Sequence, residues 1–214
     1  MAHDTLRLLT LKEYAGVNRN DPIRFYFWPL LGRMYRRRVE LCLNECLGGE
    51  DILEIGFGTG VTFLNLSDKY SRIYGLDLTA SVKEVALVYE RRGLNPILQN
   101  GSVLAMPYAD NYFDSVLLIS ILEHLKPREL GLAFSEIRRV LKPGGQMIYG
   151  VPTDNTFMRL CFLMLGYNIR KHHFSSERAV AQAASEIFRL VHYTPMKSFL
   201  PLMGNVYEIG HFIK

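Results

Sequence analysis

One stretch, DILEIGFGTGVTFLNL (residues 51–66), constrains the fold of this chain more than any other. Its apolar run ends abruptly in Gly56, Gly58 and Gly60, and the apolar residues that follow are spaced for one face of a helix. Glycine tolerates positive φ and has no Cβ to obstruct a ligand. A strand, a glycine turn and a helix in this order let the backbone approach a bound nucleotide closely. The stretch therefore predicts a nucleotide-binding unit of an α/β fold.

The glycine spacing distinguishes between two kinds of nucleotide site. A dinucleotide fingerprint, G-x-G-x-x-G, would have its third glycine at position 61, where Val61 stands, so a nicotinamide enzyme is disfavoured. The chain instead reads E-x-G-x-G-x-G, with Glu54 two residues before the first glycine. Residues 73–77 then read as a second strand that ends in Asp77. A carboxylate about 20 residues beyond the glycine turn is expected to bind ribose.

With this pattern the sequence resembles the class I, Rossmann-like S-adenosylmethionine-dependent methyltransferases, in particular the small-molecule "methyltransferase type 11" group. Two more segments carry the resemblance. Residues 111–125 are similar to the fourth strand and its "FD…EH" signature, and residues 141–149 to the "LKPGG" turn and fifth strand. The similar region covers about residues 48–152. The resemblance implies an α/β three-layer sandwich with a mostly parallel seven-stranded sheet, order 3-2-1-4-5-7-6, whose last strand is antiparallel.

The resemblance also implies a division of the chain. Residues 1–48 would be an N-terminal helical lid or extension, and residues 49–214 the methyltransferase domain, with 153–176 as a lid-like insertion. The two flanks are basic: residues 1–48 hold 8 Lys/Arg and 5 Asp/Glu, and residues 151–214 hold 7 and 4, which gives +3 for each. Such flanks suit an anionic partner or simply a solvated face. The arginines at 36–38 are expected on the outer, solvated side of a helix.

Cofactor contacts follow from the resemblance residue by residue. Glu54 would hold the glycine loop or contact the methionine amine, Asp77 would accept hydrogen bonds from both ribose hydroxyls, and Leu78 would pack on adenine. The methionine and ribose portion would lie on the glycine loop and the end of the fourth strand: Gly56, Phe57, Gly58, Thr59, Gly60, Ile119 and Ser120.

The adenine loop departs from the family pattern. Ser102 stands where the family commonly has an aspartate that accepts a hydrogen bond from the adenine amino group. A hydroxyl accepts without charge, so adenine recognition is expected to be weaker, or to move to the backbone of Val103 and Leu104.

The acceptor side is less constrained, because the methyl group of S-adenosylmethionine is already activated and the protein mainly supplies proximity and alignment. His124 is the best candidate for a general base, since its ordinary pKa suits proton removal. Tyr26, Trp28 and His173 are candidate walls of a substrate pocket, with core packing as the alternative. Cys42 and Cys46 read as buried thiols, and no metal site is predicted.

These observations predict methyl transfer from S-adenosylmethionine to a small, partly hydrophobic acceptor. The basic flanks leave RNA or protein methylation as one alternative, although nucleic acid is not expected because no binding module accompanies them. Ser102 and the lack of an obvious base leave a non-catalytic cofactor-binding subunit as another. The absence of a signal peptide and of a long apolar segment predicts a cytoplasmic chain.

Overall fold

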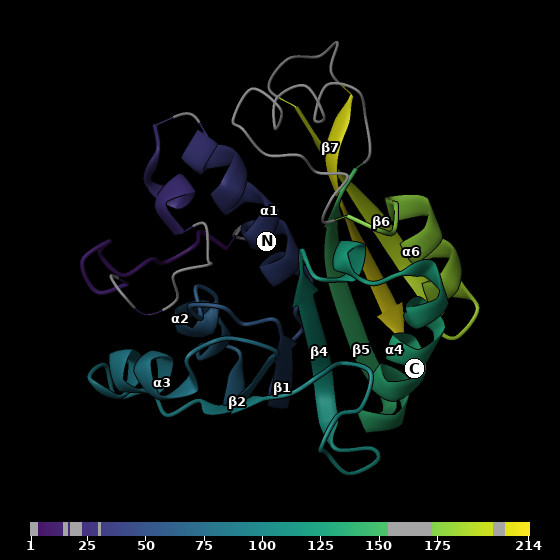
Figure 1. Cartoon of the computed structure of the whole chain (residues 1–214), viewed down its shortest axis with the longest axis horizontal. Coiled ribbons are helices and arrows are strands. Elements are labelled where there is room, and N and C mark those ends of the chain that lie inside the picture. Colours follow the sequence, from purple (N-terminus) through teal and green to yellow (C-terminus); the bar gives the residue numbers. More distant parts are fainter. Residues whose placement is uncertain (1–3, 15–16, 18–22, 30, 154–172, 199–203) are drawn as a thin grey trace.

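Seven strands form one sheet between two layers of helices in the computed structural model (Figure 1). The structure describes the chain except residues 1–3, 15–16, 18–22, 30, 154–172 and 199–203. The described strands are β1 (Gly49–Ile55), β2 (Tyr70–Asp77), β3 (Ile97–Asn100), β4 (Phe113–Ile119), β5 (Leu141–Pro152), β6 (Arg189–Lys197) and β7 (Asn205–Ile213). The described helices are η1 (Ile23–Phe27), α1 (Leu31–Glu45), α2 (Phe63–Leu66), α3 (Val82–Glu90), η2 (Leu122–His124), α4 (Pro127–Val140) and α6 (Glu177–Ser185).

The strand order is β3-β2-β1-β4-β5-β7-β6, which confirms the predicted sheet. Strands β1 to β5 pair in parallel wherever they are neighbours. Strand β7 is antiparallel to both β5 and β6, so β6 runs in the same direction as β5. The last strand, β7, is therefore antiparallel, as predicted, and it lies between β5 and β6 in the sheet.

Helices cover both faces of the sheet. On one face, α1 packs over β4, β5 and β7, α2 over β2 and α3 over β3, and on the other face α4 packs over β5 and α6 over β7 (Figure 1). The spacing of the buried residues in α4 explains its docking, since apolar side chains three and four apart form one stripe: Leu130, Ala133, Phe134, Ile137 and Val140. Among the described residues, no helix is long and apolar enough to cross a bilayer.

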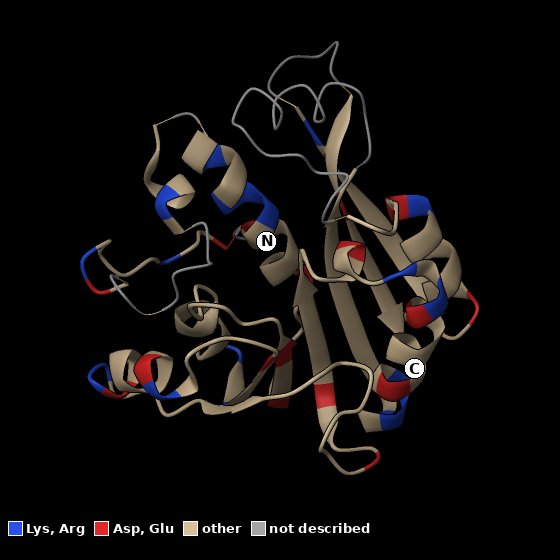
Figure 2. Cartoon of the chain, in the orientation of Figure 1, with Lys and Arg blue, Asp and Glu red and all other residues tan. Residues whose placement is uncertain are grey.

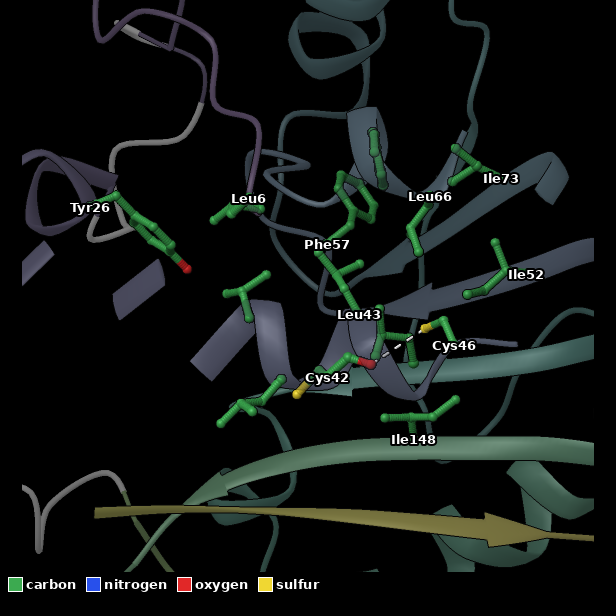
Figure 3. Packing of buried hydrophobic residues seen from close by; sticks show 14 of the residues in the cluster. Leu6, Tyr26, Cys42, Leu43, Cys46, Ile52, Phe57, Leu66, Ile73 and Ile148 are labelled. Carbon is green, nitrogen blue, oxygen red and sulfur yellow. Dashed lines mark hydrogen bonds between the residues drawn. The ribbon is translucent and has the colours of Figure 1, made fainter. Parts of the chain in front are cut away.

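Cys42, on α1, and Cys46, the residue after this helix, lie in the core, as predicted (Figure 3). The Cys46 thiol donates to the Cys42 carbonyl at 3.6 Å, in the last turn of α1. Burial raises the pKa of Cys46 to about 12, so the group stays a neutral thiol near pH 7. Both cysteines therefore pack as small apolar side chains.

The LKPGG segment differs from its predicted form of a turn before the fifth strand. It belongs to β5 itself, but its pairing with β4 is irregular: Phe113 pairs with Leu141 and Ser115 with Gln146. β5 has extra residues between these two pairs, and Gly144, at φ +76°, allows the backbone to accommodate them. Asp114 anchors the segment, since it accepts from Lys142 Nζ at 2.6 Å.

A histidine on β7 is held neutral by its surroundings. His211 is buried, and its Nδ1 lies 3.2 Å from Oε2 of Glu45, which His192 Nε2 also contacts at 2.8 Å. When the Gln146 amide is oriented to accept from Leu47 N–H, its nitrogen donates to His211 Nε2 at 3.1 Å. The proton of His211 then lies on Nδ1 and points at Glu45. Burial lowers the pKa of His211 below its ordinary 6.5.

This histidine should make the fold less stable in mild acid. As pH falls below 6.5, the unfolded chain takes up a proton that folded His211 resists, so the unfolded state binds more protons and stability is lost. We expect the melting temperature to fall less between pH 7.5 and 5.5 in His211→Gln than in the parent chain. His192→Gln, at a half-exposed position, is the matched control. Equal pH slopes in His211→Gln and the parent chain would contradict this prediction.

Candidate cofactor and acceptor site

The carboxyl ends of β1, β2, β3 and β4 meet at one edge of the sheet, next to the end of β5. In the register, Ile55 of β1 pairs with Leu76 of β2 and with Leu118 of β4, Asp77 pairs with Asn100 of β3, and Ile119 pairs with Gly150 of β5. Since these strands are parallel and stop at the same level, the residues after them lie side by side. Ligands of open α/β sheets bind at this carboxyl edge. It holds the predicted cofactor contacts Gly56, Asp77, Ser102 and Ser120.

The glycine loop after β1 has the conformation that only glycine adopts easily. Gly56, Gly58 and Gly60 have φ of +76°, +53° and +72°. A Cβ on Gly56 would collide with Cδ1 of Ile121, and one on Gly60 would lie 2.6 Å from the Phe63 ring. The predicted turn is therefore confirmed, and its backbone remains uncovered by side chains of its own.

Two side chains from outside the loop fix its shape. Buried Glu54 accepts a hydrogen bond from Oγ1 of Thr62, the residue before α2, so it ties the end of β1 to the start of that helix. Tyr89 of α3 donates its hydroxyl to the Gly60 carbonyl at 2.5 Å and to that of Thr59 at 3.2 Å. The glycine spacing did not predict these contacts of Thr62 and Tyr89, although a buried carboxylate such as Glu54 needs a hydrogen-bond donor.

Phe57 and Thr59 are inside the protein, not at the surface of the loop. Both are almost fully buried. The Phe57 ring fills the space over Gly75 of β2, where a Cβ would lie 2.6 Å from Cδ1 of that ring. Only the backbone of these two residues is therefore available to a ligand.

Asp77 connects the glycine loop to the segment after β2. Its Oδ2 accepts from Gly58 N at 3.0 Å, and its Oδ1 accepts from Thr79 N at 2.8 Å and Ala80 N at 2.9 Å. A carboxylate offers about four acceptor positions. Three are occupied, so one remains on Oδ2, enough for one ribose hydroxyl without any rearrangement.

These residues fit the adenosine portion of S-adenosylmethionine. The partly exposed Asp77 carboxylate offers a charged acceptor for a hydroxyl. Next to it Leu78 is 71% exposed, which is unusual for a leucine and provides an apolar surface for a base. The bare glycine backbone lies opposite. A hydroxyl acceptor, an apolar surface and an uncovered loop at one sheet edge match a nucleoside.

The loop after β3 uses its serine internally. Ser102 Oγ accepts from Leu104 N at 3.2 Å, and the backbones of Ser102 and Ala105 form an isolated bridge. Val103 is buried between this loop and the sheet. The hydroxyl of Ser102 thus closes a short turn and keeps only part of its acceptor capacity for a ligand.

Ser102→Asp should tighten cofactor binding. A carboxylate accepts from Leu104 N as well as the hydroxyl does, and it adds a charged acceptor, worth about 1 kcal/mol more than a neutral one. We expect the Kd for S-adenosyl-L-homocysteine to fall about fivefold, measured by calorimetry, since 1.4 kcal/mol is tenfold. Ser135→Asp, on α4, is the control for added charge. Weaker binding by Ser102→Asp would show that the serine is required as it stands.

Within the run of three arginines at 36–38 of α1, Arg38 does not face solvent, so the expectation that all three do is wrong for this residue. Its Nη1 donates to Ser120 Oγ at 3.0 Å and its Nη2 to the Tyr26 hydroxyl at 3.1 Å. Its guanidinium lies 4.3 Å from the Tyr35 ring centre. Ser120, at φ +58°, also shares a 2.8 Å hydrogen bond with Tyr207. Arg38 thus bridges the N-terminal helices and the end of β4.

Glu123, His124 and His173 come together beyond β4. The Glu123 carbonyl accepts from Phe174 N at 2.8 Å and Ser175 N at 3.3 Å. These bonds hold the two segments together, and the ring centres of His124 and His173 are 5.3 Å apart. Glu123 is 3% exposed, and its Oε2 has no hydrogen-bond partner among the described residues. Burial raises the pKa of Glu123 to about 8, against the opposing charge of Arg38.

The candidate pocket residues of the N-terminus differ in exposure. Tyr26 is 4% exposed and belongs to the core, whereas Trp28 is 48% exposed. Most of the predicted insertion at 153–176, with its apolar segment, lies outside the described residues.

Residues 53–149 match the family model described as a methyltransferase domain. The strand order and the adenosine-fitting edge agree with this match. Residues 53–149 are thus similar in sequence to a methyltransferase domain, and the sheet that contains them has the strand order of the class I, Rossmann-like methyltransferase fold.

Known proteins are similar to this chain in sequence or in fold. The chain is 34% identical over 126 residues to an uncharacterised protein of Methanocaldococcus jannaschii (58% of this chain, 55% of that protein). It is 31% identical over 114 residues to a demethylmenaquinone methyltransferase of Beutenbergia cavernae (52% and 45%). The N-methyltransferase NodS of Bradyrhizobium japonicum, solved with S-adenosyl-L-homocysteine, has the same fold, with a TM-score of 0.71, 19% identity and 95% of each chain covered. The chain spans about half the length of the first curated relatives it matches.

Proposed function

We propose that this chain transfers the methyl group of S-adenosylmethionine to a small acceptor with an apolar part. The choice of S-adenosylmethionine as the methyl donor rests on the carboxyl edge, where Asp77, Leu78 and the glycine loop fit adenosine. The bound cofactor would supply a methyl group on a positively charged sulfur. The residues of the chain would hold the two reactants in line, which is worth roughly 7–11 kcal/mol of the barrier.

An aromatic cluster supports the apolar acceptor. Tyr26 shares Arg38 with Ser120, so η1 adjoins the end of β4. From Tyr26, ring contacts at 5.5, 5.3 and 5.2 Å lead through Tyr35 and Phe25 to the half-exposed Trp28. Aromatic surfaces that remain exposed beside a cofactor edge suit an apolar ligand. The similarity to a demethylmenaquinone methyltransferase agrees with this choice.

The alternative acceptor is RNA, because arginines outnumber acidic residues on η1 and α1 (Figure 2). The arginine run supports RNA binding less strongly in the structure than in the sequence, because Arg38 donates hydrogen bonds to Ser120 and Tyr26. Phosphate binding needs free guanidinium groups, and its affinity falls steeply with salt.

Two measurements test the proposal in order. Calorimetry with S-adenosyl-L-homocysteine tests the cofactor site alone. Formation of that product from S-adenosylmethionine is then followed with quinols, long-chain phenols, small polar amines and total tRNA. We expect turnover with the apolar acceptors. Salt-sensitive turnover on tRNA would establish the alternative, and binding without turnover on any acceptor would indicate a non-catalytic subunit.

Trp28→Ala should affect the acceptor more than the cofactor. Removing the exposed indole takes apolar contact area from the ligand, so we expect a KM for the apolar acceptor raised about tenfold, since a large apolar side chain contributes about 1.5–3 kcal/mol. The Kd for S-adenosyl-L-homocysteine should stay the same. Leu47→Ala, at a 76% exposed position after α1, is the control. An unchanged KM in Trp28→Ala would remove the aromatic cluster from the pocket.

A further inference from the structure

We propose that Glu123, His124 and His173 bind a divalent first-row transition-metal ion, a site that the sequence did not predict. One ligand atom from each side chain lies within 4.8 Å of the other two. Ligands at about 2.0–2.2 Å from an ion are themselves about 3.5 Å apart in a tetrahedral site. Small side-chain rotations therefore bring the three groups to coordinating distance.

An independent observation concerns the carboxylate. Glu123 is 3% exposed, and Oε2 has no hydrogen-bond partner in the part of the chain that the structure describes. Burying an unpaired carboxylate costs free energy, so such groups either take a proton or coordinate a cation. The two imidazoles beside it favour a cation, because their nitrogen lone pairs are ligands of the same ion.

The backbone preorganises the three ligands. The 3₁₀ turn η2 closes with a hydrogen bond from His124 N to the Ile121 carbonyl at 3.0 Å. Ser175 Oγ donates to the Leu125 carbonyl at 2.6 Å, which adds to the backbone bonds that Glu123 accepts. His173 is thereby held against η2, although it is 50 positions away in the sequence from Glu123. The entropy cost of ordering these ligands therefore falls on folding and not on binding of the ion.

The ligand set selects the type of ion. Two imidazoles and one carboxylate suit Zn²⁺, Co²⁺, Mn²⁺ or Fe²⁺, whereas Mg²⁺ and Ca²⁺ prefer oxygen ligands throughout. His124 is exposed, so the ion would keep solvent-accessible positions, as catalytic sites with three protein ligands do. Metal binding can be measured without an acceptor, so this inference does not depend on methyl transfer.

A second histidine–carboxylate cluster provides the internal control. Glu45, His192 and His211 are equally close. There, however, the carboxylate already accepts from both imidazoles. The Gln146 amide, oriented by Leu47 N–H, donates to His211 Nε2 and keeps the proton of His211 on Nδ1, the atom that faces Glu45. A metal would have to displace that proton and turn the Gln146 amide against Leu47 N–H. This cluster is therefore a hydrogen-bonded group and not a metal site.

Cobalt titration of the untagged, chelator-stripped chain tests the proposal. We expect one Co²⁺ to bind, with a visible d–d absorption band that Zn²⁺ abolishes and millimolar Mg²⁺ does not. His124→Ala, His173→Ala and Glu123→Gln should each weaken binding by more than about tenfold. His192→Ala should bind like the parent chain. Thermal melting and S-adenosyl-L-homocysteine binding confirm that each variant is folded.

Three results would overturn the site. The first is an intact chain that binds S-adenosyl-L-homocysteine but neither Co²⁺ nor Zn²⁺ at micromolar concentration. Binding that persists in both His124→Ala and His173→Ala would place the ion elsewhere. Loss of binding in His192→Ala alone would assign it to the Glu45 cluster.

Discussion

Asp77→Ala should weaken binding of S-adenosyl-L-homocysteine by at least about 100-fold, since a hydrogen bond to a charged group contributes about 1.5–3 kcal/mol and this carboxylate has two tasks. It offers the remaining acceptor position to the ribose. It also accepts from Gly58 N and Ala80 N, which keeps the glycine loop next to the segment after β2. Alanine removes the ligand contact and loosens the loop together.

Asp77→Asn separates these two tasks. The amide oxygen can still accept from Thr79 N and Ala80 N, but its NH₂ group cannot accept from Gly58 N, and the charge is lost. We expect about tenfold weaker binding, intermediate between the parent chain and Asp77→Ala, from the loss of charge assistance. Calorimetry measures all three proteins.

The control for Asp77 is an exposed carboxylate that pairs with an arginine. Asp110 is 68% exposed in its side chain and contacts Arg139 Nη1 at 2.8 Å, away from the carboxyl edge. Asp110→Ala should bind S-adenosyl-L-homocysteine as the parent chain does. If Asp77→Ala, shown to be folded by its melting temperature, bound within threefold of the parent, the ribose would have to lie elsewhere and the proposed cofactor site would fail.

Local motifs made most of the fold and the carboxyl edge of the sheet predictable. The glycine turn combines residues that are close in sequence, and its conformation follows from glycine itself: Gly56, Gly58 and Gly60 all have positive φ. Asp77 was predictable because a parallel βαβ unit places the end of the second strand beside the first. The sheet order came from the resemblance, since four motifs in sequence order define that topology.

Contacts between distant segments were not predictable in the same way. Arg38 belongs to a run of three arginines, which reads as a solvated face. Its partners are Ser120, 82 residues away, and Tyr26 on a neighbouring helix. Nothing in the run distinguishes Arg38 from Arg37 until the helix is docked. The burial of Glu123 was hidden for the same reason, because the 173–175 segment that covers it lies far along the chain.

Arg38→Leu should therefore destabilise the fold, whereas the same change at the neighbouring arginine should not. The guanidinium donates to Ser120 and Tyr26 and lies against the Tyr35 ring, so leucine leaves two hydrogen-bond acceptors without their charged donor. The loss is about 2–4 kcal/mol, from hydrogen bonds to a charged group that are partly replaced by water. For a chain of this length, this lowers the melting temperature by about 5–15 °C.

Arg37 is the matched control, because it is next in the chain and has a half-exposed side chain that forms an ion pair with Glu40 at 4.0 Å. Arg37→Leu should change stability by less than about 0.5 kcal/mol, as is usual for surface positions. Thermal melting of both variants at pH 7.5 gives the comparison. Equal melting temperatures would mean that the bridge from α1 to Ser120 contributes nothing to the fold. A large loss confined to Arg38→Leu would mean that this side chain, together with the core residues of α1, holds the N-terminal helices against the end of β4, where the aromatic cluster adjoins the cofactor edge.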